Sequence, residues 1–83
     1  MKENIRFKKS VYKDLAKIHP KHREQILDDI ENGTLYNTNK VKPLKGEYKG
    51  LFRIEIGDYR IIFAKIGEDV LILRIAHRKE VYR

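Results

Sequence analysis

Cysteine is absent from this 83-residue chain, which excludes disulfide bonds, thiolate metal ligands and a cysteine nucleophile. No apolar run reaches the roughly 18 residues that a membrane-spanning helix needs. The N-terminus lacks the apolar stretch of a signal peptide, so we expect a cytoplasmic protein with no membrane partner. The three histidines (His19, His22 and His77) are not spaced as metal ligands, so we expect no metal site. We also expect no small-molecule cofactor.

Acidic residues are also scarce. The chain has 12 Asp and Glu against 19 Lys and Arg, for a net charge of +7. In so small a domain this excess favours a polyanionic or acidic partner, such as RNA, DNA, the ribosome or an acidic protein. A basic surface that serves only solubility is the alternative. The length predicts a single domain over residues 1–83, with a thin core that must use every apolar face.

The first part of the chain predicts a strand followed by two helices. Polar and apolar residues alternate over residues 4–7, which indicates a short strand. From about Ser10 the apolar residues recur every three or four positions, which predicts a helix to about residue 18. Pro20 suits the start of a second helix, and Asn32-Gly33 suits its end. Both helices are short and amphipathic, so we expect an antiparallel helical hairpin packed on a sheet.

A basic loop is expected next. Residues 34–50 are polar and contain four lysines against one acidic residue, together with one proline and two glycines. Lysines in such a loop can follow a nucleic-acid backbone, and Lys45 and Lys49 are our candidates for that contact. A flexible surface connection is the alternative interpretation.

The second half of the chain predicts a β-hairpin. Gly57-Asp58 is a two-residue turn between the strand-like segments 51–56 and 59–66. In that register Glu55 opposes Arg60, and opposed residues share a face of the sheet. One face then carries the apolar set, which consists of Phe52, Ile54, Ile56, Tyr59, Ile61 and Phe63. The other face carries Arg53, Glu55, Arg60, Ile62, Ala64 and Ile66.

A third strand is predicted over residues 70–77, after the three-residue loop Gly67-Glu68-Asp69. A loop with an odd number of residues adds further residues to the apolar set, namely Leu71, Leu73 and Ile75. An even loop would instead turn Arg74 into the helix-covered core, where an unpaired charge is very costly, so we expect the odd loop. The predicted fold class is α+β: an N-terminal strand, an antiparallel helical hairpin and a three-stranded antiparallel meander, with the helices packed on one face of the sheet.

The opposite side of the sheet gathers cationic side chains. We define the arginine face by its four arginines, which are Arg53, Arg60, Arg74 and Arg78. Small Ala64 and Ala76 leave room between them, as in a concave anion site. Guanidinium groups suit phosphate because they stay charged and bond two oxygens at once. A surface ion-pair network, for instance Glu55 with Arg60, is the alternative.

Four ordered motifs carry a family resemblance over essentially the whole chain. They are Leu44-Lys45-Gly46, Gly50-Leu51-Phe52-Arg53-Ile54, Gly57-Asp58-Tyr59-Arg60-Ile61-Ile62-Phe63 and His77-Arg78-Lys79-Glu80-Val81-Tyr82. Together they resemble the RelE/ParE toxin superfamily, and RelE most closely. The resemblance implies an α+β toxin of a type II toxin–antitoxin pair, neutralised by a RelB-like antitoxin.

The resemblance to RelE also implies an activity. RelE-like toxins enter the ribosomal A site and cleave mRNA there, which inhibits translation. A 2′-hydroxyl attacks the adjacent phosphate and leaves a 2′,3′-cyclic phosphate and a 5′-hydroxyl end. The implied function is therefore that of a ribosome-dependent endoribonuclease whose partners are the ribosome, mRNA and the antitoxin.

Single residues match the family's functional positions. Arg60, which follows Gly-x-Tyr, is expected to hold the scissile phosphate. Arg78 takes the place of the arginine that stabilises the leaving group or the developing charge. Tyr82, in the terminal Val-Tyr, is expected to stack on a base. Arg74 and Lys79 are expected to bind the RNA backbone beside them.

One strand departs from the RelE pattern, which has two lysines where this chain has Arg53 and Glu55. Arg53 can hold phosphate but cannot accept a proton. Glu55 either acts as the general base or only neutralises Arg60 and attenuates RNA binding. His77 is directed toward the apolar side by the same alternation, which favours a structural histidine over a base.

Two other functions stay open. A ParE-like toxin that poisons DNA gyrase would share the fold and the charge without cleaving RNA. A non-catalytic ribosome- or RNA-binding module would use the arginines for binding alone. The cluster of Arg53, Arg60, Arg78 and Tyr82 favours RNA cleavage over both.

Overall fold

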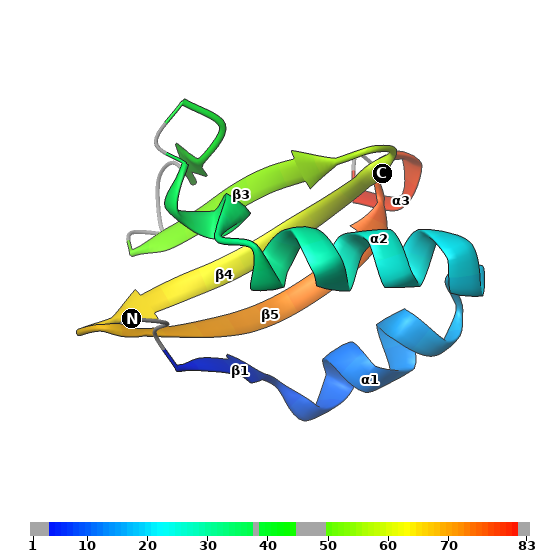
Figure 1. Cartoon of the computed structure of the whole chain (residues 1–83), viewed down its shortest axis with the longest axis horizontal. Coiled ribbons are helices and arrows are strands. Elements are labelled where there is room, and N and C mark those ends of the chain that lie inside the picture. Colours follow the sequence, from blue (N-terminus) through cyan, green and yellow to red (C-terminus); the bar gives the residue numbers. More distant parts are fainter. Residues whose placement is uncertain (1–3, 38, 45–49, 82–83) are drawn as a thin grey trace.

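A computed structural model describes residues 4–37, 39–44 and 50–81 of the chain. Its elements are β1 (Ile5–Phe7), α1 (Lys9–Ala16), α2 (Pro20–Glu31), the 3-10 helix η1 (Thr34–Tyr36), β2 (Lys42–Pro43), β3 (Leu51–Ile56), β4 (Tyr59–Ile66), β5 (Asp69–His77) and α3 (Arg78–Val81). The strands form one sheet in the order β1-β5-β4-β3-β2, and α1 and α2 run in opposite directions over one of its faces (Figure 1). The predicted α+β class is confirmed. Among the described residues, no helix has the length and apolar character needed to cross a membrane.

The helical hairpin forms where the sequence predicts it. Pro20 occupies the first turn of α2, and His19 caps this helix by accepting a hydrogen bond at Nδ1 from the Lys21 backbone N–H at 3.1 Å. Gly33 follows the end of α2 with a φ of 89°, a left-handed conformation that suits glycine. Helix α1 is shorter than expected and ends at Ala16, although Ile18 beyond it remains buried.

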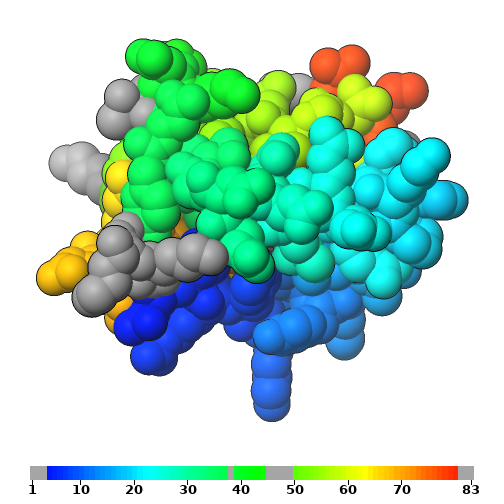
Figure 2. Space-filling view, in the orientation of Figure 1, coloured from blue at the N-terminus to red at the C-terminus, as the bar shows by residue number. Residues whose placement is uncertain are grey.

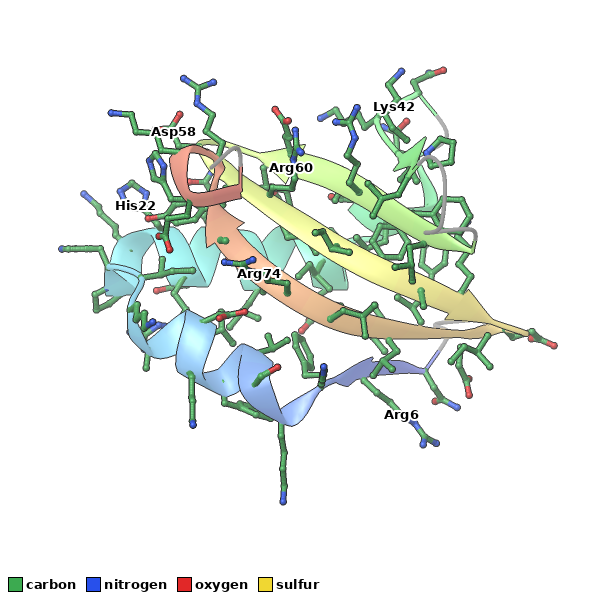
Figure 3. The ribbon with its side chains drawn as sticks, turned by 180° about the vertical axis from the view of Figure 1, so that it is seen from behind. Arg6, His22, Lys42, Asp58, Arg60 and Arg74 are labelled. Atoms are coloured by element: carbon green, nitrogen blue, oxygen red, sulfur yellow. The ribbon has the colours of Figure 1, made fainter. Side chains whose placement is uncertain are left out.

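The core lies between the helices and the sheet. The helical hairpin contributes its buried apolar side chains, which are Val11, Leu15, Ile18, Ile26 and Ile30. The central strands contribute Ile54, Ile56, Ile61, Phe63, Val70, Ile72 and Ile75. Each fully buried side chain of this kind stabilises the fold by about 1.5–3 kcal/mol. In Figure 2 the helices cover this side of the molecule. We call the opposite face of the sheet, which Figure 3 shows from behind, the open face.

The two edges of the sheet were not predicted. Strand β1 runs parallel to β5, with Ile5 beside Val70 and Phe7 beside Ile72. Beyond β1, helix α1 covers the β5 edge, because Asp14 Oδ2 accepts a hydrogen bond from the Ile75 backbone N–H at 3.0 Å. At the other edge, part of the expected basic loop forms the two-residue strand β2 beside β3.

The β3–β4 hairpin has the predicted register. Ile56 pairs with Tyr59, Glu55 with Arg60, and Phe52 with Phe63 across the Gly57-Asp58 turn. The apolar set of these two strands packs into the core beneath the helices, and the set that contains Arg53, Glu55 and Arg60 lies on the open face (Figure 3). The alternation of polar and apolar residues and the two-residue length of the turn were therefore sufficient to predict the register of this hairpin.

The β4–β5 connection corrects two predictions. Ile66 pairs with Asp69, so the loop has two residues, Gly67 and Glu68, and the predicted odd loop is wrong. A β-bulge then restores the alternation: Ile62 pairs with Arg74 but Phe63 pairs with Ile72, which leaves Leu73 as the extra residue.

The two-residue loop changes which residues of β5 are buried before the bulge. Val70 and Ile72 are buried in the core, and the placement of Leu71 and Leu73 in the apolar set is wrong. Ile75 and Arg74 nevertheless keep their predicted sides, because both lie beyond the bulge. Arg74 pairs with Ile62 on the open face and is exposed.

Candidate functional site

Strand pairing brings three members of the arginine face together. Arg53 on β3 pairs with Ile62 on β4, and Ile62 pairs with Arg74 on β5, which forms one row across the open face. Arg60 stands in the neighbouring row between Glu55 and Ala76. Figure 3 looks onto this face and labels Arg60 and Arg74 on their strands. The structure thus confirms the predicted grouping of these arginines on one side of the sheet.

Arg60 differs from its neighbours in burial. Only 7% of its surface is exposed, whereas Arg74 is exposed and Arg53 is half-buried. A guanidinium held inside the protein is costly unless it is paired and hydrogen-bonded. Arg60 Nη2 donates a hydrogen bond to Glu55 Oε2 at 2.7 Å, a short and charge-assisted contact. Arg60 is therefore a fixed cation at the base of the arginine face.

Glu55 connects two guanidinium groups. Its Oε2 lies 2.7 Å from Arg60 Nη2 and 3.8 Å from Arg53 Nη1. The side chains of Glu55 and Arg53 are 40% and 33% exposed, so an anion from solution can reach Arg53 directly, and it reaches the buried Arg60 where it takes the place of the Glu55 carboxylate. A carboxylate and a phosphate can each bind an arginine through two of their own oxygens. Glu55 therefore occupies a position that suits a phosphate.

Arg78 stands beside the β3–β4 turn at the start of α3. Its backbone N–H donates a hydrogen bond to the Asp58 carbonyl at 2.9 Å, which fixes the beginning of α3 against the turn. Its Nη2 lies 3.9 Å from Asp58 Oδ1, and both side chains are largely exposed. A pair this long and this solvated contributes little to stability, so the guanidinium remains available to a ligand.

The remaining predicted residues divide into two groups. Lys79 follows Arg78 on α3 and is exposed, and its backbone N–H donates a hydrogen bond to His77 Nδ1 at 3.2 Å. Lys45, Lys49 and Tyr82 lie outside the described residues.

His77 faces away from the arginines. It pairs with Tyr59, on the helix side of the sheet, and their rings meet edge to face at 5.4 Å between centroids. The predicted direction of His77 is therefore confirmed. This placement separates the imidazole from the open face.

Lys42 is a residue of the site that the sequence placed only in a loop. Strand β2 pairs Lys42 with Arg53, so its position continues the row of Arg74, Ile62 and Arg53 to the edge of the sheet. Lys42 is exposed, and Figure 3 labels it on the outer strand of the sheet. A two-residue strand that contains proline has too little pattern to be recognised from sequence.

Comparisons with known proteins agree on one family. The family model described as the ParE toxin of the type II toxin–antitoxin system parDE matches residues 5–82. Toxin RelE3 of Methanocaldococcus jannaschii is 31% identical over 83 residues, which cover 94% of this chain and 93% of that protein.

Solved structures of similar shape point the same way. The toxin–antitoxin complex RelBE2 from Mycobacterium tuberculosis has a chain 28% identical to this one, with a TM-score of 0.79, covering 94% of this chain and 100% of that chain. The RelB–RelE antitoxin–toxin complex from Methanococcus jannaschii gives 31% identity and a TM-score of 0.74, with coverages of 93% and 94%. The archaeal RelE–RelB complex from Pyrococcus horikoshii OT3 gives 26% identity and a TM-score of 0.72, with coverages of 94% and 97%.

Proposed function

Because the chain belongs to the ParE/RelE toxin family, we propose that it is a RelE-like toxin that cleaves mRNA in the ribosomal A site and thereby inhibits translation. The observation that carries the proposal is the buried Arg60 guanidinium, set beside Arg53 and Arg74 on an open sheet face. Such a cluster binds a phosphodiester more readily than a neutral or cationic substrate.

A RelB-like antitoxin is the proposed protein partner. The three similar structures described above are complexes of toxins with proteins of this kind. The net charge of +7 favours an acidic partner, and a carboxylate of that partner would compete with RNA phosphate for the arginine face.

In the proposed reaction the arginines position and stabilise the phosphate. The substrate's 2′-hydroxyl oxygen forms a bond to phosphorus while the bond from phosphorus to the 5′-oxygen breaks. The hydroxyl proton is lost and the leaving oxygen gains one, which gives the cyclic phosphate and the free 5′-hydroxyl. Arg60 and Arg53 hold the phosphate oxygens, and Arg78 stabilises the negative charge that develops on the leaving oxygen.

We assign Glu55 to positioning Arg60 and competing with phosphate, rather than to proton transfer. Its Oε2 already lies against both guanidinium groups at 2.7 and 3.8 Å, an arrangement that directs the carboxylate toward the cations. Catalysis then rests on orientation of the RNA and on fixed positive charge, two contributions that need no general base within the chain.

Primer extension on mRNA from arrested cells tests the proposal. Arg60→Ala and Arg60→Lys should both abolish the new 5′ ends, because lysine keeps the charge but not the forked geometry. Lys13→Ala, at an exposed position of α1, removes one charge on the helix side and serves as the control. Full cleavage by folded Arg60→Ala protein would end the proposal.

The ParE description of the matching family model favours a second candidate, a toxin that poisons DNA gyrase. This candidate uses the basic surface without cutting RNA. A gyrase supercoiling assay with the purified protein separates the two functions. Inhibition of supercoiling without new mRNA ends would select the gyrase poison, whereas RNA binding without either effect would select a non-catalytic RNA-binding module.

A further inference from the structure

A cavity of about 260 Å³ lies between the start of α2 and the end of the sheet. Its lining includes Ile26 of α2 and Tyr59 on the helix side of the sheet, whereas Arg53, Arg60 and Arg74 lie on the open face. Buried Ile26 and Ile56 line its interior. Its volume is several times the roughly 30 Å³ that one water molecule occupies in the liquid, so it can take a small organic group. None of the roles proposed above for the arginines uses this cavity.

Three rings line the same cavity. Tyr59 stands between two histidines, with its ring centroid 6.0 Å from that of His22 and 5.4 Å from that of His77. The rings pack on one another, and His22 is the exposed member of the three, so its ring can present a flat surface on which a planar ligand stacks. Aliphatic Ile26 and Ile56 complete an environment that favours a flat group over a flexible chain.

Polar groups complete the lining. Gln25 on α2 and Asp58 in the β3–β4 turn are exposed members of it. The Gln25 amide can donate and accept hydrogen bonds, and the Asp58 carboxylate can accept them. Stacking surfaces combined with such edge contacts match the chemistry of a nucleobase, which has apolar faces and a hydrogen-bonding edge.

The cavity is connected to the arginine face through one residue pair. Asp58 lines the cavity, and its Oδ1 lies 3.9 Å from Arg78 Nη2. Figure 3 places the labelled Asp58 and His22 at the end of the sheet where α3 begins, with Arg60 farther along the open face. A phosphodiester chain that passes Arg78 can therefore bring the adjoining base to this end of the sheet.

We propose that the cavity is a nucleobase pocket, which holds one base of the RNA whose backbone lies on the arginine face. The proposal rests on the proposed function for the identity of the nucleic acid. An antitoxin side chain is the competing occupant. The ring-lined interior and the link to Arg78 favour the base, because a cationic surface leads directly to a pocket for planar groups.

Titration of the purified protein with nucleosides, followed by NMR of the histidine and tyrosine rings, tests this pocket without any cleavage. Adenosine and uridine should shift the ring signals of His22, Tyr59 and His77. His22→Ala should weaken nucleoside binding about tenfold by removal of one stacking ring. Gln25→Ala should also weaken binding, and it should bring the affinities for adenosine and uridine closer together because the amide contacts the edge of the base. Tyr12→Ala, which removes an exposed ring on α1, is the matched control and should leave binding unchanged.

Two further arms separate this proposal from the proposed function. Arg60→Ala should retain nucleoside binding even if cleavage is lost, because a nucleoside carries no phosphate. Ribose 5-phosphate should leave the three rings unshifted. Three results would overturn the proposed nucleobase pocket: no ring shifts at saturating nucleoside, unchanged nucleoside affinity in His22→Ala, or shifts caused only by ribose 5-phosphate. Ring shifts produced by a RelB-like antitoxin but not by nucleosides would overturn it as well.

Discussion

Arg60 and Glu55 face each other across β3 and β4, and a 2.7 Å hydrogen bond joins Arg60 Nη2 to Glu55 Oε2. Burial of the guanidinium makes this contact important for the fold as well as for the site. A phosphate that reaches Arg60 must share the guanidinium with Glu55 or displace the carboxylate. The same pair therefore stabilises the free protein and opposes the ligand.

Glu55→Gln separates these two effects. Removal of the negative charge should tighten binding of a short RNA several-fold and lower the free energy of unfolding by about 1–3 kcal/mol, because Arg60 loses a charged acceptor. Fluorescence anisotropy and chemical denaturation measure the two quantities. A fall in mRNA cleavage of a hundredfold or more, with RNA binding kept, would instead identify Glu55 as the general base.

Arg53→Lys restores the lysine that the RelE pattern has at this position. We expect the rate of ribosome-dependent cleavage to change by less than about fivefold, because Arg53 is half-buried beside the buried Arg60 and contributes mainly positive charge, which a lysine preserves. Cleavage rates on programmed ribosomes provide the measurement. An increase beyond tenfold would show that the cleavage rate of this protein is limited by the lack of a proton-transferring side chain at position 53.

RNA affinity should depend steeply on salt. For single-stranded RNA, each phosphate contact contributes about 0.7 to the slope of log affinity against log salt concentration. Arg74→Ala should lower the slope by that amount, since Arg74 lies exposed in the row that contains Arg53. Lys13→Ala is the control of equal charge, and an equal loss of slope in that variant would argue against a localised site.

Two isoleucines of β4 provide a matched test of the core. Ile61 is 0% exposed and Ile66 is 61% exposed, although both lie on the same strand. Ile61→Ala should lower the free energy of unfolding by about 2–5 kcal/mol through lost burial and a residual cavity. Ile66→Ala should change it by less than about 0.5 kcal/mol, and equal effects in urea denaturation would contradict the described core.

The predictable part of the site followed from local constraints. The two-residue turn at Gly57-Asp58 fixed the pairing of Glu55 with Arg60, because one register alone suits a turn of that length. Arg74 reached its predicted side by a different route from the one expected. Burial of its charge in the core would be costly, so Arg74 lies on the open face although a two-residue loop and a bulge, and not the expected three-residue loop, place it there.

The bulge itself left no signal. Residues 70–73 are all apolar, so both alternations of this segment look equally suited to the core, and Leu73 cannot be distinguished as the extra residue. The position of β1 depends on its pairing with β5, which follows it by more than 60 residues in the chain, and Lys42 owes its place to a two-residue strand. Such long-range and very short pairings have no periodic pattern to reveal them.

Asp14 has a consequence for how this protein behaves in concentrated solution. Its carboxylate satisfies the Ile75 backbone N–H on the stretch of β5 that β1 leaves uncovered. A strand from another molecule would need that N–H to continue the ladder, and it would also meet a negative charge there. Helix α1, with Asp14 bonded to the strand, thereby discourages edge-to-edge polymerisation without an additional strand at this edge.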